Sequence, residues 1–120
     1  MKTLEQRILM LPDFNPETMK DDGVTDIFYN YTDELYAFLR NFYDLKIIDI
    51  NSPGPSKRYP KIKDKDLDQL NIEELILFLD WHFYGERFSA GVIATIIKNG
   101  KLDQAVKRLK KLAKEELNKL

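Results

Sequence analysis

Apolar residues recur with helical spacing along most of the chain, and the most apolar stretch lies in its second half. Over residues 72–84, large aliphatic and aromatic side chains fill most of the helix surface and leave a narrow polar side, marked by Glu73 and Asp80. Asn71 followed by Glu74 forms a capping box, in which each side chain satisfies a free backbone N–H at a helix start. The pattern predicts a helix over residues 72–84 that other elements enclose.

A second apolar segment follows, in which Phe88, Val92 and Ile96 recur with helical spacing. Gly100 stands where a left-handed C-cap would end this helix. Gly91 falls inside the segment, where glycine costs about 1 kcal/mol relative to alanine. Its presence therefore predicts that another part of the backbone passes close by.

Helix starts are also indicated in the N-terminal half. Thr3 with Gln6 is another capping box and predicts a short helix that Pro12 ends. Either Thr25 or Thr32 then caps a longer helix rich in leucine and phenylalanine. Tyrosines are interleaved with this segment, an arrangement typical of core residues whose hydroxyls lie at the rim: Tyr29, Tyr31, Tyr36 and Tyr43.

Three stretches lack helical spacing. Residues 13–23 are polar and contain Asp-Asp-Gly, which predicts an irregular loop. Residues 45–50 are β-branched and alternate enough to predict an extended connector or a minor hairpin. Residues 51–65 mix proline, glycine and lysine, which is typical of a surface loop. A final amphipathic helix with a leucine-rich seam follows residue 100.

These elements predict an all-α fold, organised as a single compact domain over residues 1–120. About five helices surround the central apolar helix at 72–84, and a Pro/Lys-rich surface loop lies at about residues 51–65.

The amino-acid composition excludes several kinds of chemical site. The chain has 120 residues, no cysteine and a single histidine, His82, so neither a disulfide nor a zinc site built from cysteine and histidine is expected. His82 is expected to be a hydrogen-bonded core or boundary residue. No apolar run approaches the roughly 20 residues of a membrane span, and no long apolar segment follows the N-terminus. We expect a soluble, cytoplasmic protein that does not enter a membrane.

The net charge of −1 hides an uneven distribution. Residues 1–50 carry five Lys or Arg against ten Asp or Glu, a net charge of −5. Residues 101–120 carry seven basic and three acidic residues, a net charge of +4. Such asymmetry marks either a partner surface or, more commonly, an internal match between an acidic half and a basic last helix.

Three acidic residues stand at every second position, as the calcium ligands do at the start of an EF-hand loop: Asp64, Asp66 and Asp68. Such a loop needs glycine at its sixth position and glutamate at its twelfth, where this chain has Gln69 and Leu75. The sequence therefore predicts no metal site, and it contains no motif for a cofactor.

Basic and aromatic residues alternate in the surface loop. They could bind phosphates and stack a base, although such loops are more often only solvated. The candidate nucleic-acid patch consists of Lys57, Arg58, Tyr59, Lys61 and Lys63.

Polar residues interrupt the apolar run at Glu86 and Arg87, which are expected to open the second apolar helix. One interpretation is a buried structural ion pair that locks the corner between the two helices. The other is a ligand-facing anion pocket lined by Trp81, Tyr84 and Arg87. The candidate binding residues are therefore Trp81, Tyr84, Glu86 and Arg87, and no catalytic residue is predicted.

The same corner carries a family resemblance through a G-E-R-F-x-x-G core, an Asn-Gly turn and an Arg-Leu pair in the last helix. In this chain those residues are Gly85, Glu86, Arg87, Phe88, Gly91, Asn99, Gly100, Arg108 and Leu109. The arrangement resembles a family of small uncharacterised bacterial proteins, known only as a domain of unknown function. The resemblance covers the last third to half of the chain, and Ala90 replaces an acidic residue frequent in the family. It implies an all-helical fold and no assigned activity.

The leading functional hypothesis is a non-enzymatic module that binds another protein, of the kind found among small regulators or phage-encoded inhibitors of host systems. The alternative is a nucleic-acid-binding protein that uses the basic loop and the last helix. A second alternative is a small-molecule enzyme at the corner between Trp81 and Arg87, because corners of this kind can form pockets.

Overall fold

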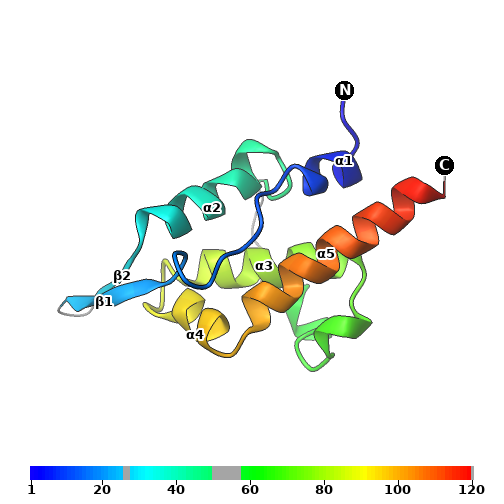
Figure 1. Ribbon diagram of the computed structural model, residues 1–120. Helices are drawn as coiled ribbons and strands as arrows, with labels where there is room; N and C mark the ends of the chain where they lie inside the picture. Colours follow the sequence, from blue (N-terminus) through cyan, green and yellow to red (C-terminus); the bar gives the residue numbers. More distant parts are fainter. Residues whose placement is uncertain (26–27, 50–57, 120) are drawn as a thin grey trace.

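The computed structural model describes residues 1–25, 28–49 and 58–119 of the chain (Figure 1). Within these residues, five α-helices and two short 3-10 helices accompany one antiparallel hairpin. The elements follow the order α1 (Leu4–Leu9), β1 (Asp21–Thr25), β2 (Phe28–Tyr31), α2 (Asp33–Asp44), η1 (Tyr59–Lys61), η2 (Leu67–Gln69), α3 (Ile72–Gly85), α4 (Val92–Lys98) and α5 (Lys101–Asn118). The fold is mostly helical and forms one domain, but the hairpin corrects the all-α expectation.

Helix α3 lies at the centre, as its apolar sequence predicts. It packs on α4 and α5, and Figure 1 shows α2 running along its other side. Leu75 and Leu79 are fully buried. The Phe83 ring meets the Phe42 ring of α2 edge to face, with centroids 5.2 Å apart. The capping box of Asn71 with Glu74 begins the helix as expected.

Helix α1, near the N-terminus, lies beside the last helix, α5 (Figure 1). Helix α1 begins with the predicted capping box and packs along α5, whose Leu102 and Leu109 are fully buried. The Arg7 guanidinium donates hydrogen bonds to the carbonyls of Leu45 (3.0 Å) and Lys46 (2.7 Å). These bonds tie α1 to the end of α2. None of the described helices has both the length and the hydropathy that crossing a bilayer requires.

The hairpin replaces part of the irregular loop expected over residues 13–23. Val24 pairs with Tyr29 and Asp21 with Tyr31, and a bulge between Asp21 and Val24 shifts the register. Gly23 lies in this bulge at φ +97°, a left-handed conformation that glycine adopts without steric cost. Because the chain is still extended here, Thr32 rather than Thr25 caps α2.

The extended connector or minor hairpin expected at residues 45–50 is wrong over its described part, which ends at residue 49. Lys46 takes a positive φ of 56°, and the backbone N–H groups of Ile47 and Ile48 both donate to the carbonyl of Phe42. The chain therefore turns at the end of α2. The β-branched side chains of Ile47 and Ile48 are buried in the core, which explains their apolar character without a strand.

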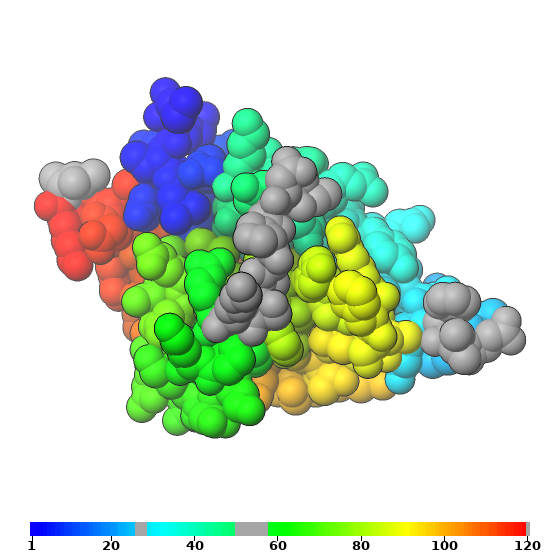
Figure 2. Space-filling model, turned by 180° about the vertical axis from the view of Figure 1, so that it is seen from behind, coloured from blue at the N-terminus to red at the C-terminus, as the bar shows by residue number. Residues whose placement is uncertain are grey.

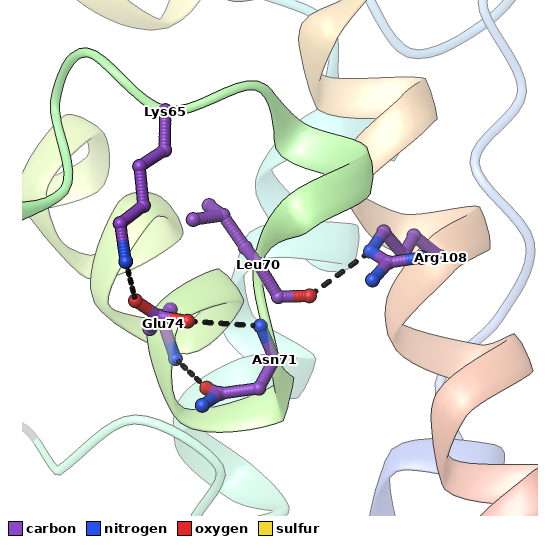
Figure 3. Close-up of polar contacts among 5 residues, drawn as sticks. All are labelled: Lys65, Leu70, Asn71, Glu74 and Arg108. Atoms are coloured by element: carbon purple, nitrogen blue, oxygen red, sulfur yellow. Dashed lines mark hydrogen bonds and ion pairs between the residues drawn. The ribbon is translucent and has the colours of Figure 1, made fainter.

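The segment from residue 58 to 70 contains η1 and η2, and polar contacts hold it to the rest of the domain (Figure 3). Arg108 Nε donates to the Leu70 carbonyl at 3.0 Å, and Lys65 Nζ lies 3.1 Å from Glu74 Oε2. The polar side chain of Glu74 thus both completes the capping box of α3 and holds this segment. Residues 51–57 of the expected loop lie outside the described residues.

Candidate functional site

The corner between α3 and α4 is built around the side chain of Glu86. Glu86 Oε1 accepts hydrogen bonds from the Tyr31 hydroxyl (2.7 Å) and the Ile93 N–H (2.8 Å). Glu86 Oε2 accepts one from the Gly91 N–H (2.8 Å). Two of these donors are backbone groups at the start of α4 that lack partners within the helix. The carboxylate therefore caps α4 and anchors it to β2.

Tyr31 completes this link. Its hydroxyl donates to Glu86 and accepts a hydrogen bond from the Ala94 N–H at 3.2 Å. Burial and the adjacent carboxylate raise the pKa of Tyr31, so the phenol stays protonated and able to donate. The hairpin and the corner are thus joined by a partly buried chain of hydrogen bonds.

Gly91 forms the last part of the corner, and the expectation that it lies inside a helix is wrong. It caps α4 with φ +93°, and α4 begins only at Val92. A Cβ at this position would stand 2.6 Å from the Tyr29 ring. The close approach that the glycine predicted is real, but a side chain makes it instead of a backbone segment.

Glu86 and Arg87 do not pair in the described structure, so the interpretation of a buried structural ion pair is wrong. Glu86 is turned into the protein, whereas Arg87 is exposed and has no carboxylate of the described residues within ion-pair distance. Its guanidinium carbon lies 5.6 Å from the centroid of the Tyr84 ring, within reach of a cation–π interaction. Both residues also precede α4 instead of opening it.

An apolar groove of about 370 Å³ adjoins Arg87, which we call the aromatic groove. Phe88 at its edge is 75% exposed, and Tyr84 is 37% exposed. The rings of Tyr84 and Phe88 pack with centroids 5.2 Å apart. Figure 2 shows this corner in yellow on the face seen from behind. The groove is lined by Trp81, Tyr84, Gly85, Phe88, Ser89 and Val92.

Trp81 is held in place by Tyr59, one of the residues of the candidate nucleic-acid patch. The two rings stack with centroids 4.5 Å apart and planes inclined by 10°. One face of the Tyr59 ring is therefore already covered, and burial with the nearby Asp64 carboxylate raises the pKa of its phenol. Arg58, Lys61 and Lys63 are exposed beside it. Lys57 lies outside the described residues.

His82 is half-buried at the boundary of the core, as expected. Its Nδ1 lies 2.7 Å from the Phe78 carbonyl oxygen, and burial lowers its pKa. In the part of the chain that the structure describes, no three His, Asp or Glu side chains are grouped to hold a metal ion.

Sequence reasoning missed two residues of this site. The spacing of Phe88 with Val92 and Ile96 predicts a helical position, but Phe88 precedes α4, and its polar neighbours are the signal for a turn. The interleaved tyrosines predict only a general aromatic core for Tyr31. Its alternation with Tyr29 in the Phe-Tyr-Asn-Tyr run was the available signal for a strand that presents both rings on one side.

Comparison with known proteins gives a family and no activity. No curated protein and no solved structure matches the chain. A family model described as a family of unknown function matches residues 2–115, well beyond the last third to half that the corner motif covers. Because the match spans nearly all of its length, the chain belongs to this family of unknown function, DUF6508.

Proposed function

We propose that this protein is a non-enzymatic module that regulates another protein by binding it through the aromatic groove. The observation that carries the proposal is Phe88, which is 75% exposed beside an apolar groove of about 370 Å³. Burial of a phenylalanine side chain contributes about 1.5 to 3 kcal/mol, so this ring offers binding free energy that the free protein does not use. Exposed apolar surface next to a groove is typical of interaction sites.

The residue types of the groove support the same function. Tryptophan, tyrosine, phenylalanine and arginine are enriched at the centres of protein interfaces, where they supply most of the binding energy. Here Trp81 is fixed by the Tyr59 stack, and Glu86 fixes the backbone that carries Arg87 and Phe88. A partner would therefore meet a preformed surface, which lowers the entropic cost of binding.

The charge beside the aromatic groove indicates which kind of partner segment would bind there. Arg87 is exposed at the groove without a carboxylate partner among the described residues, while Glu86 beside it is turned inward and occupied by three donors. The free charge at the groove is positive. We infer that the occupant is a protein segment with a bulky apolar side chain that enters the groove and an Asp or Glu that meets Arg87.

Photo-crosslinking in cells of the source organism tests this proposal. The photoreactive residue p-benzoylphenylalanine would be placed at position 88 and, as a matched control, at position 24, where Val24 is also exposed. The expected result is a protein crosslinked from position 88 and not from position 24, through an acidic segment with an apolar anchor. Arg87→Glu should reduce the crosslink at least tenfold, because it places like charges together.

The contrary outcomes are equally specific. Equal crosslinking from positions 24 and 88, or none from position 88, would contradict the groove as a binding site. Binding to single-stranded RNA whose affinity falls by orders of magnitude between about 50 and 200 mM salt would instead assign the function to nucleic acid. In that case Ala replacements at Arg58, Lys61 and Lys63 should abolish binding, and Phe88→Ser should not.

A further inference from the structure

A second cavity lies on the other side of Tyr59, between the η1–η2 segment, α3, α4 and the start of α5. Its volume of about 400 Å³ falls in the range of small-molecule sites. Charged side chains lie around its rim, among them Lys63, Asp66, Asp68 and Lys101. Its apolar wall is made of buried side chains: Ile62, Leu67, Leu70, Phe78 and Ile96. We call this space the His82 cavity.

His82 lines this cavity and carries a hydrogen-bond acceptor without a partner among the described residues. The Phe78 carbonyl oxygen can only accept, so the 2.7 Å contact requires the proton to be on Nδ1. The neutral imidazole then has a lone pair on Nε2. Among the described residues, Nε2 has no hydrogen-bond partner, and no unpartnered side-chain nitrogen or oxygen is sealed from solvent. Nε2 is therefore not sealed from solvent, and it belongs to a residue that lines the cavity.

Lys101 supplies a positive charge on the same cavity. It is the charged side chain whose field contributes, after burial, to the lowered pKa of His82. Other lysines of α5 are engaged, since Lys107 pairs with Asp103 at 3.0 Å and Lys110 with Asp13 at 2.8 Å. Lys101 has no ion pair within the described part of the chain. Its ammonium group is thus available to an anion.

The rim of the cavity also carries two acidic residues, Asp66 and Asp68. Asp68 Oδ1 accepts a hydrogen bond from Gln104 at 3.4 Å. The lining of the cavity therefore combines the His82 acceptor with the Lys101 cation.

We propose that the His82 cavity binds a small organic acid whose anionic group meets Lys101 and whose O–H or N–H group donates to His82 Nε2. The apolar body of the ligand packs on the buried wall formed by Ile62, Phe78 and Ile96. This site shares Val92 with the lining of the aromatic groove but does not depend on the proposed protein partner.

The single histidine makes the site directly observable, because the imidazole resonances of the full chain arise from His82 alone. The first measurement is the nitrogen spectrum of the free protein, which should show a protonated Nδ1 and an unprotonated Nε2. Titration with 3- and 4-hydroxybenzoate should then shift the His82 resonances saturably for at least one of the two. Benzoate lacks the donor and 4-hydroxybenzamide lacks the charge, so each should bind about tenfold more weakly.

Variants of α5 provide the matched comparison. Lys101→Gln should weaken binding of the hydroxybenzoate about tenfold, whereas Lys107→Gln, on the same helix but off the cavity, should leave it unchanged. The absence of a saturable His82 shift up to about 10 mM of either probe, ten times the dissociation constant of a weak site, would overturn the proposal. Equal binding by wild type and Lys101→Gln would do the same. The crosslink from position 88 and the His82 shift are separate readouts, so the two proposals can fail independently.

Discussion

The Tyr31 hydroxyl donates a 2.7 Å hydrogen bond to Glu86 Oε1 and so joins the hairpin to the corner that carries the aromatic groove. The two residues stand 55 positions apart in the sequence. The same hydroxyl accepts from the Ala94 N–H, which has become buried at the start of α4. One phenol therefore satisfies groups on two elements, and the corner is organised by a contact far away along the chain.

Removal of this phenol should destabilise the protein. Tyr31→Phe deprives Glu86 of a donor and leaves the buried Ala94 N–H without its acceptor, for which we expect a loss of about 1 to 3 kcal/mol in the free energy of unfolding. Urea denaturation measures this loss. Tyr36→Phe, whose ring is 46% exposed, is the control and should stay within about 0.5 kcal/mol of wild type. Equal stability of Tyr31→Phe and wild type would contradict the structural role of the link.

Two glycines have similar backbone angles, so alanine replacements at the two positions distinguish the cost of backbone strain from the cost of steric crowding. Gly91 and Gly100 cap α4 and α5 at φ +93° and +79°, but only at Gly91 would a Cβ meet another side chain, the Tyr29 ring. Gly100→Ala should cost about 1 kcal/mol through strain alone, and Gly91→Ala should cost measurably more. The excess should shrink in a Tyr29→Ala background, which a double-mutant cycle of unfolding free energies would detect. An unchanged excess would locate the cost elsewhere.

Helix starts and the central helix could be predicted because their signals are local. Thr3 with Gln6 and Asn71 with Glu74 lie three positions apart, and both capping boxes form as expected. The hairpin could not be predicted in the same way, because its Asp-Asp-Gly strand reads as a turn. What fixes the hairpin in place is distant and involves its other strand, β2: Tyr29 packs on Gly91, and Tyr31 bonds to Glu86.

The candidate site was predictable in its composition and not in its geometry. Trp81 and Tyr84 line the aromatic groove and Arg87 lies beside it against the Tyr84 ring, but the groove is apolar and differs from the anion pocket that the sequence indicated. Glu86 was expected beside Arg87 as a partner, but three donors from β2 and α4 turn it inward. No spacing rule contains that information, because two of the donors are backbone groups exposed only where α4 happens to begin.

Two arginines should respond differently to the same conservative change. Arg108 Nε donates to the Leu70 carbonyl at 3.0 Å and holds the segment before α3, a geometry that the lysine ammonium does not reproduce (Figure 3). Arg108→Lys should therefore lower the free energy of unfolding by about 1 kcal/mol. Arg87→Lys should leave it within about 0.5 kcal/mol of wild type, because Arg87 is exposed and lacks a carboxylate partner. A large loss at Arg87 would revive a structural role for it.

The pH dependence of the free energy of unfolding should show that His82 is buried in its neutral form. Its pKa is lowered in the folded state by burial, so the unfolded chain takes up the proton first as the pH falls below about 6.5. His82 thus contributes its full stability above pH 6.5 and loses it as the pH falls toward its folded pKa. Asp80, whose pKa burial raises, acts in the opposite sense, since protonation relieves a buried charge. The difference between wild type and His82→Gln, measured by urea denaturation from pH 7.5 to 5, isolates the imidazole. A parallel pair of curves would contradict its burial in the neutral form.

Phe83 and Phe88 lie five positions apart and should differ sharply on replacement by alanine. Phe83 is 6% exposed and packs against Phe42, so Phe83→Ala should cost about 3 to 5 kcal/mol through lost transfer energy and a cavity. Phe88 is 75% exposed, so Phe88→Ala should change the melting temperature little while it removes the anchor of the aromatic groove. Thermal melts of the two variants under identical conditions measure the contrast. Stability that falls equally in both would mean that the Phe88 ring is already buried in the free protein. A buried ring could not offer the unused surface on which the binding proposal rests.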